Sequence, residues 1–179
     1  MMALPWQIPN IPGPMRASVV KGPGALIPII RRAQRIVLVI GHTANETEVD
    51  KGKMVVEYAL ELARAGKMDL VATAHAVKEV RERGFRAATS MSLVDVVQRL
   101  GDPGWMGIDG GGNYDLAIFT GIPYATLSQA LSFLKHFAPH VKTVSIDPFY
   151  QPNANWSLPN LDYSWWGKYL RQVISDLRK

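Results

Sequence analysis

The sequence predicts an α/β fold in which a doubly wound parallel sheet lies between two layers of helices. Runs of β-branched and other apolar residues occur without alternation at 36–40 and 116–119, which is typical of strands buried on both faces of a parallel sheet. Segments with apolar residues at helical spacing separate these runs, as in successive β–α–β units. The chain of 179 residues is long enough for one such domain, over residues 24–179.

The first elements follow from composition and spacing. Residues 1–23 are rich in proline and glycine and predict an extended arm. An apolar stripe at spacings of three and four predicts a helix over 25–35. The apolar run 36–40 then predicts the first strand, and Gly41 ends it. A second apolar stripe predicts a long helix over 50–65.

The later elements alternate in the same way. Pro139 ends the helix whose stripe includes Leu127 and Leu134, and Ser164 is expected to cap the final helix, with its stripe from Trp166 to Leu177. The remaining predictions are a strand over 69–73, helices over 77–83 and 92–100, a strand over 116–119 and a strand over 141–146.

The surplus positive charge is confined to the start of the chain. The net charge is +5, no acidic residue precedes Glu46, and the remainder is electrically balanced. The basic residues at the start are Arg16, Lys21, Arg31, Arg32 and Arg35. This segment is either a solvated arm and helix, or it lies on an acidic partner or a phosphate. The balanced remainder gives no expectation of nucleic-acid binding.

Several classes of protein are excluded by what the sequence lacks. It has no cysteine, so it holds no disulfide, zinc–thiolate or iron–sulfur site. Pro139 interrupts the spacing of His136 and His140, so no metal site is expected. No apolar run approaches the length of a membrane span, and the start does not resemble a signal peptide. A cytoplasmic protein is therefore expected.

Ligands of doubly wound folds bind beyond the carboxyl ends of the strands. The residues that follow the predicted strands are Gly41, His42, Thr43, Thr73, His75, Thr120, Gly121 and Asp147. They are the candidate cofactor-binding residues. Each of the two histidines is either satisfied by nearby backbone or lines a cofactor pocket at this edge.

No other segment carries a recognisable catalytic motif. The glycine-rich segment 108–115 precedes a strand, whereas a dinucleotide fingerprint follows a strand and opens a helix. It is therefore interpreted as a tight turn with positive φ, and contact with a phosphate is the alternative. No nucleophile elbow or pair of carboxylates is present, so catalytic residues are not assigned.

The sequence also points to an interface with another protein. Residues 103–167 contain most of the aromatic residues and few charged ones, which is the composition of an interface core. Within this stretch, residues 149–160 form either a surface connection or a recognition loop. The candidate partner-binding residues in it are Tyr150, Asn153, Asn155 and Trp156.

Three segments resemble the epsilon subunit of the archaeal acetyl-CoA decarbonylase/synthase complex, the small subunit of its CO dehydrogenase component. They are residues 101–116, 131–135 and 150–155, and Pro12-Gly13-Pro14 and Ala33-Gln34-Arg35 also fit. The resemblance implies a Rossmann-like fold similar to DHS-like NAD/FAD-binding domains. It further implies a non-catalytic chain that pairs with the large (alpha) subunit, which holds the nickel–iron–sulfur centres, in an assembly of two large and two small chains.

Two roles are implied for such a subunit. One is to stabilise the large subunit, and the other is to help bind FAD, to which electrons from CO oxidation pass. The alternative function is a free-standing nucleotide- or flavin-binding enzyme with a similar fold, because a fold does not determine a function. The isolated chain is either a monomer or a homo-oligomer.

Overall fold

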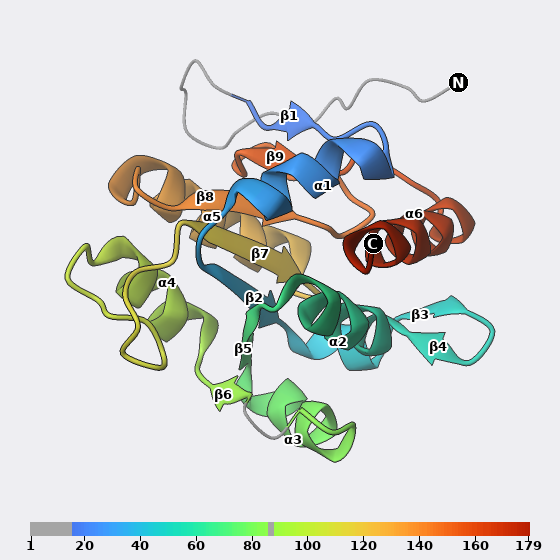
Figure 1. Cartoon of the computed structure of the whole chain (residues 1–179), viewed down its shortest axis with the longest axis horizontal. Coiled ribbons are helices and arrows are strands. Elements are labelled where there is room, and N and C mark those ends of the chain that lie inside the picture. Colours follow the sequence, from blue (N-terminus) through green and yellow to red (C-terminus); the bar gives the residue numbers. More distant parts are fainter. Residues whose placement is uncertain (1–15, 86–87) are drawn as a thin grey trace.

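The computed structural model describes residues 16–85 and 88–179, except for the side chains of Ala74 and His75 (Figure 1). Residues 1–15 of the predicted arm lie outside the described residues. The elements in chain order are β1 (Ser18–Val19), α1 (Pro23–Arg32), β2 (Ile36–Ile40), the 3-10 helix η1 (His42–Asn45), β3 (Glu48–Asp50), β4 (Lys53–Met54), α2 (Val55–Gly66), β5 (Asp69–Ala72), α3 (Ala74–Glu82), β6 (Thr89–Ser90), α4 (Leu93–Gly101), β7 (Leu116–Thr120), α5 (Tyr124–Phe137), β8 (Lys142–Ser145), β9 (Trp156–Ser157) and α6 (Tyr163–Leu177).

The described residues form a seven-stranded sheet with the order β1-β9-β8-β7-β2-β5-β6. Every neighbouring pair in it is parallel. β2 and β7 lie at its centre, and all five residues of each strand are buried. A parallel sheet needs crossover connections, and the intervening helices supply them on both faces. The predicted Rossmann-like doubly wound α/β fold is therefore confirmed.

Side chains of β2 alternate between two apolar clusters because successive residues of a strand point to opposite faces. Ile36, Leu38 and Ile40 join the cluster formed with α1, α2 and α6, whereas Val37 and Val39 join the cluster formed with α4 and α5. Figure 1 shows these two helix layers on opposite sides of the sheet. The sheet is thus covered on both faces, which explains its continuous apolar strands.

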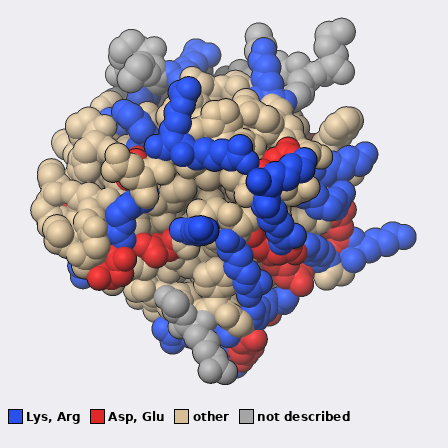
Figure 2. Space-filling view, in the orientation of Figure 1, with Lys and Arg blue, Asp and Glu red and all other residues tan. Residues whose placement is uncertain are grey.

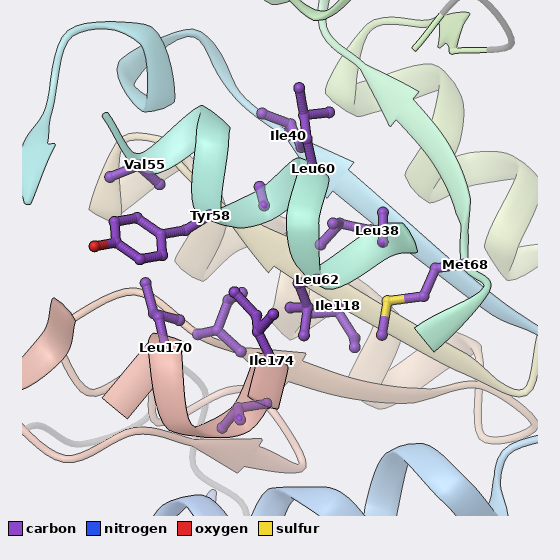
Figure 3. Close-up of a cluster of buried hydrophobic side chains, with 14 of the residues drawn as sticks. Leu38, Ile40, Val55, Tyr58, Leu60, Leu62, Met68, Ile118, Leu170 and Ile174 are labelled. Carbon is purple, nitrogen blue, oxygen red and sulfur yellow. The ribbon is translucent and has the colours of Figure 1, made fainter. Parts of the chain in front are cut away.

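The larger cluster holds α2 and α6 together over the central strands. Figure 3 shows Leu62 of α2 beside Ile118 and Ile174, whereas Leu60 of α2 lies by Ile40 of β2. Leu38 and Ile118 are completely buried there. Because α6 is the last helix, the carboxyl-terminal part of the chain completes the core.

The described part of the predicted arm lies at the edge of the sheet. Residues 18–19 form β1, which pairs with β9 at the edge of the sheet in the register Ser18↔Trp156. Ala17 and Val20 on either side are buried. The described part of the predicted arm is therefore packed against the domain, and α1 begins at Pro23.

Two helix starts differ from the sequence predictions. The helix predicted from residue 50 begins at Val55, because a hairpin of β3 and β4 comes first, with a turn at Gly52 (φ 76°). The final helix is capped by Asp162 and not by Ser164, because an Asp162 side-chain oxygen accepts a hydrogen bond from the backbone N–H of Trp165 at 2.8 Å.

Candidate functional site

The carboxyl ends of the central strands border a small cavity. Its volume is about 160 Å³. Thr43 follows β2, Gly121 follows β7 and Asp147 follows β8, so three of the predicted residues lie together here. The cavity is also lined by Thr47, Val55, Ile122, Pro123, Tyr124, Pro148, Phe149, Gln151, Tyr163 and Trp166.

Asp147 is the strongest electrostatic feature of this cavity. Its Oδ1 accepts hydrogen bonds from the Thr120 hydroxyl at 2.7 Å and from the backbone N–H of Gly121 at 2.9 Å. Burial raises the pKa of Asp147 to about 6, although these hydrogen bonds and one from Ile122 act to lower it. The carboxyl group of Asp147 therefore accepts the hydrogen bonds of the backbone N–H groups that follow β7.

The chain segments that follow β2 and β7 approach each other closely at Gly41 and Gly121. A Cβ atom on Gly41 would overlap the carbonyl oxygen of Gly121. Gly121 has a φ of 66°, and a Cβ atom there would overlap Ala44 of η1. The space beside each glycine is thus filled by the protein itself, and this close approach requires glycine at both positions.

The other predicted cofactor residues lie at the same edge but do not line the cavity. His42 is the first residue of η1 and is partly buried, and Thr120 is buried beneath Asp147. Thr73 precedes α3, and its buried hydroxyl has no hydrogen-bond partner among the described residues. His75 lies in α3, and its side chain is outside the described part of the chain.

Sequence reasoning found only part of the aromatic rim of the cavity. Tyr124, Phe149 and Tyr163 line it and are 40%, 50% and 45% exposed. Phe149 belongs to the segment 147–150 that the strand-end rule selects, and Tyr124 follows β7 closely, so the same rule could have found it too. Tyr163 and Trp166 come from α6, whose position over this edge depends on tertiary packing.

The residues of this edge do not fit a complete FAD molecule. Ligand pockets of this kind usually measure roughly 300–1,000 Å³, well above the observed volume. No lysine or arginine lines the cavity among the described residues. The carboxyl group of Asp147 already accepts the backbone N–H groups that a pyrophosphate would need. The strand-end cavity, taken by itself, thus lacks the charge and the space for a dinucleotide.

The residues predicted to bind a partner are mostly engaged within the chain. The Tyr150 hydroxyl donates to the carbonyl of Ala17 at 2.6 Å, and the Asn153 amide donates to the carbonyl and hydroxyl of Ser128, both at 3.1 Å. The side-chain oxygen of Asn155 accepts from the backbone N–H of Thr143 at 2.8 Å. These bonds fix the loop 149–160 against β1, α5 and β8.

Trp156 differs from the other three partner candidates. It is the first residue of β9 and is only partly buried against the core. Its ring also lines a second pocket, at the opposite edge of the sheet. Trp156 therefore retains a surface that another protein can contact, and Asn155 beside it is also only partly buried.

The glycine-rich segment lies at the amino edge of the sheet. Arg35 organises it by donating to the carbonyl of Gly112 and pairing with Asp109 at 2.5 Å and Asp69 at 3.1 Å. Gly110 and Gly112 have φ values of 78° and 117°. The predicted turn with positive φ is thus confirmed.

Large apolar side chains are exposed in the stretch that the composition singled out. They are Met106, Tyr124, Phe133, Phe137, Phe149, Tyr163 and Trp165. Phe137 and Trp165 are 67% and 61% exposed. Some of this stretch forms surface rather than core, as its composition predicted.

The described residues contain neither a metal-binding cluster nor a helix suited to a membrane. No group of three or more His, Asp or Glu side chains is arranged to hold a metal ion. None of the described helices has the length and apolar composition needed to cross a membrane.

Comparison with known proteins identifies relatives over nearly the whole chain. The chain is 36% identical to the acetyl-CoA decarbonylase/synthase complex subunit epsilon of Methanothermobacter thermautotrophicus, over 97% of this chain and 95% of the relative. It is 37% identical to subunit epsilon 1 of that complex from Archaeoglobus fulgidus, over 96% and 91%. Residues 1–174 match the family described as CO dehydrogenase beta subunit/acetyl-CoA synthase epsilon subunit, and the chain belongs to that family.

Proposed function

We propose that this chain is the epsilon subunit of an acetyl-CoA decarbonylase/synthase complex. Its role is to dock on the large (alpha) nickel–iron–sulfur subunit and to stabilise it, in an assembly of two large and two small chains. Relatives that carry this subunit's name align over nearly their full length, which supports the proposal. The observation that carries the docking role is the exposed apolar surface between residues 103 and 167.

This surface has two parts that a partner can cover. On α5, Phe133 and Phe137 are exposed and their ring centroids lie 5.2 Å apart. At the carboxyl ends of the strands, Tyr163 of α6 and Phe149 are exposed and line the same cavity, and Trp165 of α6 is also exposed. Leaving such rings in water is unfavourable by roughly 25 cal/mol for each Å² of apolar area, so a partner that covers them gains binding energy.

The chain is proposed to be non-catalytic. Asp147 has the most perturbed carboxyl group at the candidate site, but it already accepts hydrogen bonds from Thr120 and Gly121. Its role is to join the ends of β7 and β8. Burial of the carboxyl group at this junction accounts for its raised pKa without a reaction, because the hydrogen bonds themselves act to lower the pKa.

A flavin role is proposed only for the assembled complex. Because this chain's strand-end edge does not fit a pyrophosphate, a flavin bound by the complex takes its phosphate contacts from another subunit. Titration of FAD, followed by flavin fluorescence, should detect no binding to this chain alone. Saturable binding by the isolated chain would contradict this division of the site.

Anaerobic affinity purification of the tagged chain from the cells that produce it tests the proposed function. We expect a large, cysteine-rich nickel–iron subunit to be retained in near-equal amount, as identified by mass spectrometry. Phe137→Ser and Trp165→Ser each remove an exposed aromatic ring and should reduce retention of the large subunit. Lys78→Ala, at an exposed position of α3, serves as the control. Recovery of the chain alone, as a monomer or homo-oligomer, would refute the proposal.

A further inference from the structure

A second pocket lies at the opposite edge of the sheet from the strand-end cavity, beneath the end of α1. Its volume is about 250 Å³. It is lined by Pro28, Ile29, Arg32, Ala33, Asp115, Leu116, Lys142 and Trp156. We propose that this pocket binds an acidic side chain, with an apolar neighbour, that the large subunit presents. The inference rests on the proposed function and specifies one contact through which docking occurs.

Three residues that line this pocket come from adjacent strands and point to the same face of the sheet. Leu116, Lys142 and Trp156 are the first residues of the adjacent strands β7, β8 and β9. Leu116 is directly opposite Lys142 in register, and Trp156 is opposite Val144. Residues opposite each other in register point to the same face, which here is the face covered by α1. Most of the pocket is therefore formed by α1 and the three strands, and Ala33 and Asp115 come from the short segments next to them.

The inner wall is apolar and aromatic. Ile29, Ala33 and Trp156 are partly buried and pack against the core, so one side of each remains available. Pro28 lies inside α1 on the same side. An indole ring beside aliphatic carbon is a surface on which an apolar side chain packs well. The pocket thus offers a place for the apolar neighbour of the acidic group.

The rim carries two cations that no carboxylate neutralises. Within the described ranges, neither Arg32 nor Lys142 has an acidic group within ion-pair distance, and the Lys142 ammonium donates only to the carbonyl of Pro139 at 3.3 Å. Arg31, by contrast, reaches the carbonyl of Asp176 at the end of α6. Figure 2 shows Lys and Arg side chains gathered over the end of α1 that leads into β2.

Asp115 is the one acidic residue in the lining of this pocket, and its carboxylate is hydrogen-bonded to the backbone. The two oxygens of Asp115 accept the backbone N–H groups of Gln34 and Arg35, each at 2.8 Å. They join the start of β2 to the start of β7, so this carboxylate is turned to the backbone rather than to Arg32 or Lys142. The pocket therefore presents net positive charge beside an apolar wall. A carboxylate on a protein segment fits this combination, because a guanidinium binds it through two hydrogen bonds.

Charge reversal tests the inference with little risk to the fold. Arg32 and Lys142 are exposed, so the double variant Arg32→Glu/Lys142→Glu should fold, with an unchanged thermal unfolding midpoint. Its dissociation constant for the purified large subunit, measured anaerobically by biolayer interferometry, should rise at least about tenfold because like charges then face each other. Lys51→Glu, an exposed charge in the β3–β4 turn, is the matched control and should bind as the natural chain does.

A carbodiimide, which joins a lysine ammonium to a carboxylate in direct contact, identifies the acidic group. In the intact complex we expect an amide bond between Lys142 and an Asp or Glu of the large subunit, located by peptide mass spectrometry. Equal binding by the double variant and the control, with no such cross-link, would overturn this inference and leave the proposed function intact. Failure of the natural chain to bind the large subunit would refute both.

Discussion

Asp147 should make the stability of this protein fall as the pH rises from about 4 to about 6. Its pKa is raised from the ordinary 3.8 to about 6 by burial. Between these two values the folded chain holds a proton that the unfolded chain has released, so the free energy of unfolding decreases with rising pH. Well above pH 6 the loss is complete, and the partly buried carboxylate is then charged in the folded chain as well.

The magnitude follows from the size of the shift. A shift of about two pKa units corresponds to about 3 kcal/mol, because each unit is worth about 1.4 kcal/mol. Asp147→Asn keeps the shape and an acceptor oxygen for the Thr120 hydroxyl and the Gly121 N–H, but it cannot ionise. The stability of the variant relative to the natural chain should therefore increase by about 1–2 kcal/mol between pH 5 and pH 8.

Urea unfolding at several pH values measures this difference. The other titrating groups are common to both proteins and cancel, so only the change in the difference with pH is interpreted. Asp162→Asn is the control. The pKa of Asp162 is lowered by hydrogen bonds from Trp165 and Ser164, so its effect on stability is constant above pH 5. A difference for Asp147→Asn that is flat with pH, or that decreases, would refute the reasoning.

Three further substitutions test the packing described above. Leu38→Ala opens a cavity in a fully buried strand and should lower the free energy of unfolding by about 2–5 kcal/mol in urea titrations. Gly121→Ala places a methyl group against Ala44 at a φ of 66° and should cost more than about 1 kcal/mol in the same assay. Arg35→Leu removes the hydrogen bond to Gly112 and the ion pair with Asp109, so it should speed amide hydrogen exchange in residues 107–112. Unchanged exchange would show that the turn is stable without Arg35.

The central strands were predictable because their sequence signal is local. Ile36–Ile40 has five buried residues in succession, and only a strand covered on both faces accommodates them all. The hairpin of β3 and β4 was missed because Asp50 resembles a helix cap. The turn at Gly52 instead reverses the chain, and α2 begins only where Glu57 accepts the backbone N–H of Met54.

The candidate site was predictable only where it depends on strand ends. Thr43, Gly121 and Asp147 were found because each follows a parallel strand, and parallel strands end at one edge. The loop 149–160 was predicted as exposed because it is rich in amides. Tyr150 in fact donates a hydrogen bond to Ala17, and Asn153 donates one to Ser128. These partners are distant in sequence, so no local sequence pattern predicts them.

The pairing of β1 with β9 has a consequence for how the chain is made. Ser18 is among the first described residues to leave the ribosome, but its partner Trp156 is synthesised much later. At roughly 5–20 residues per second, the first strand waits for several seconds or more before its place beside β9 exists. Closing so long a loop is slow, so folding of the sheet's edge is a late event that follows release of α6.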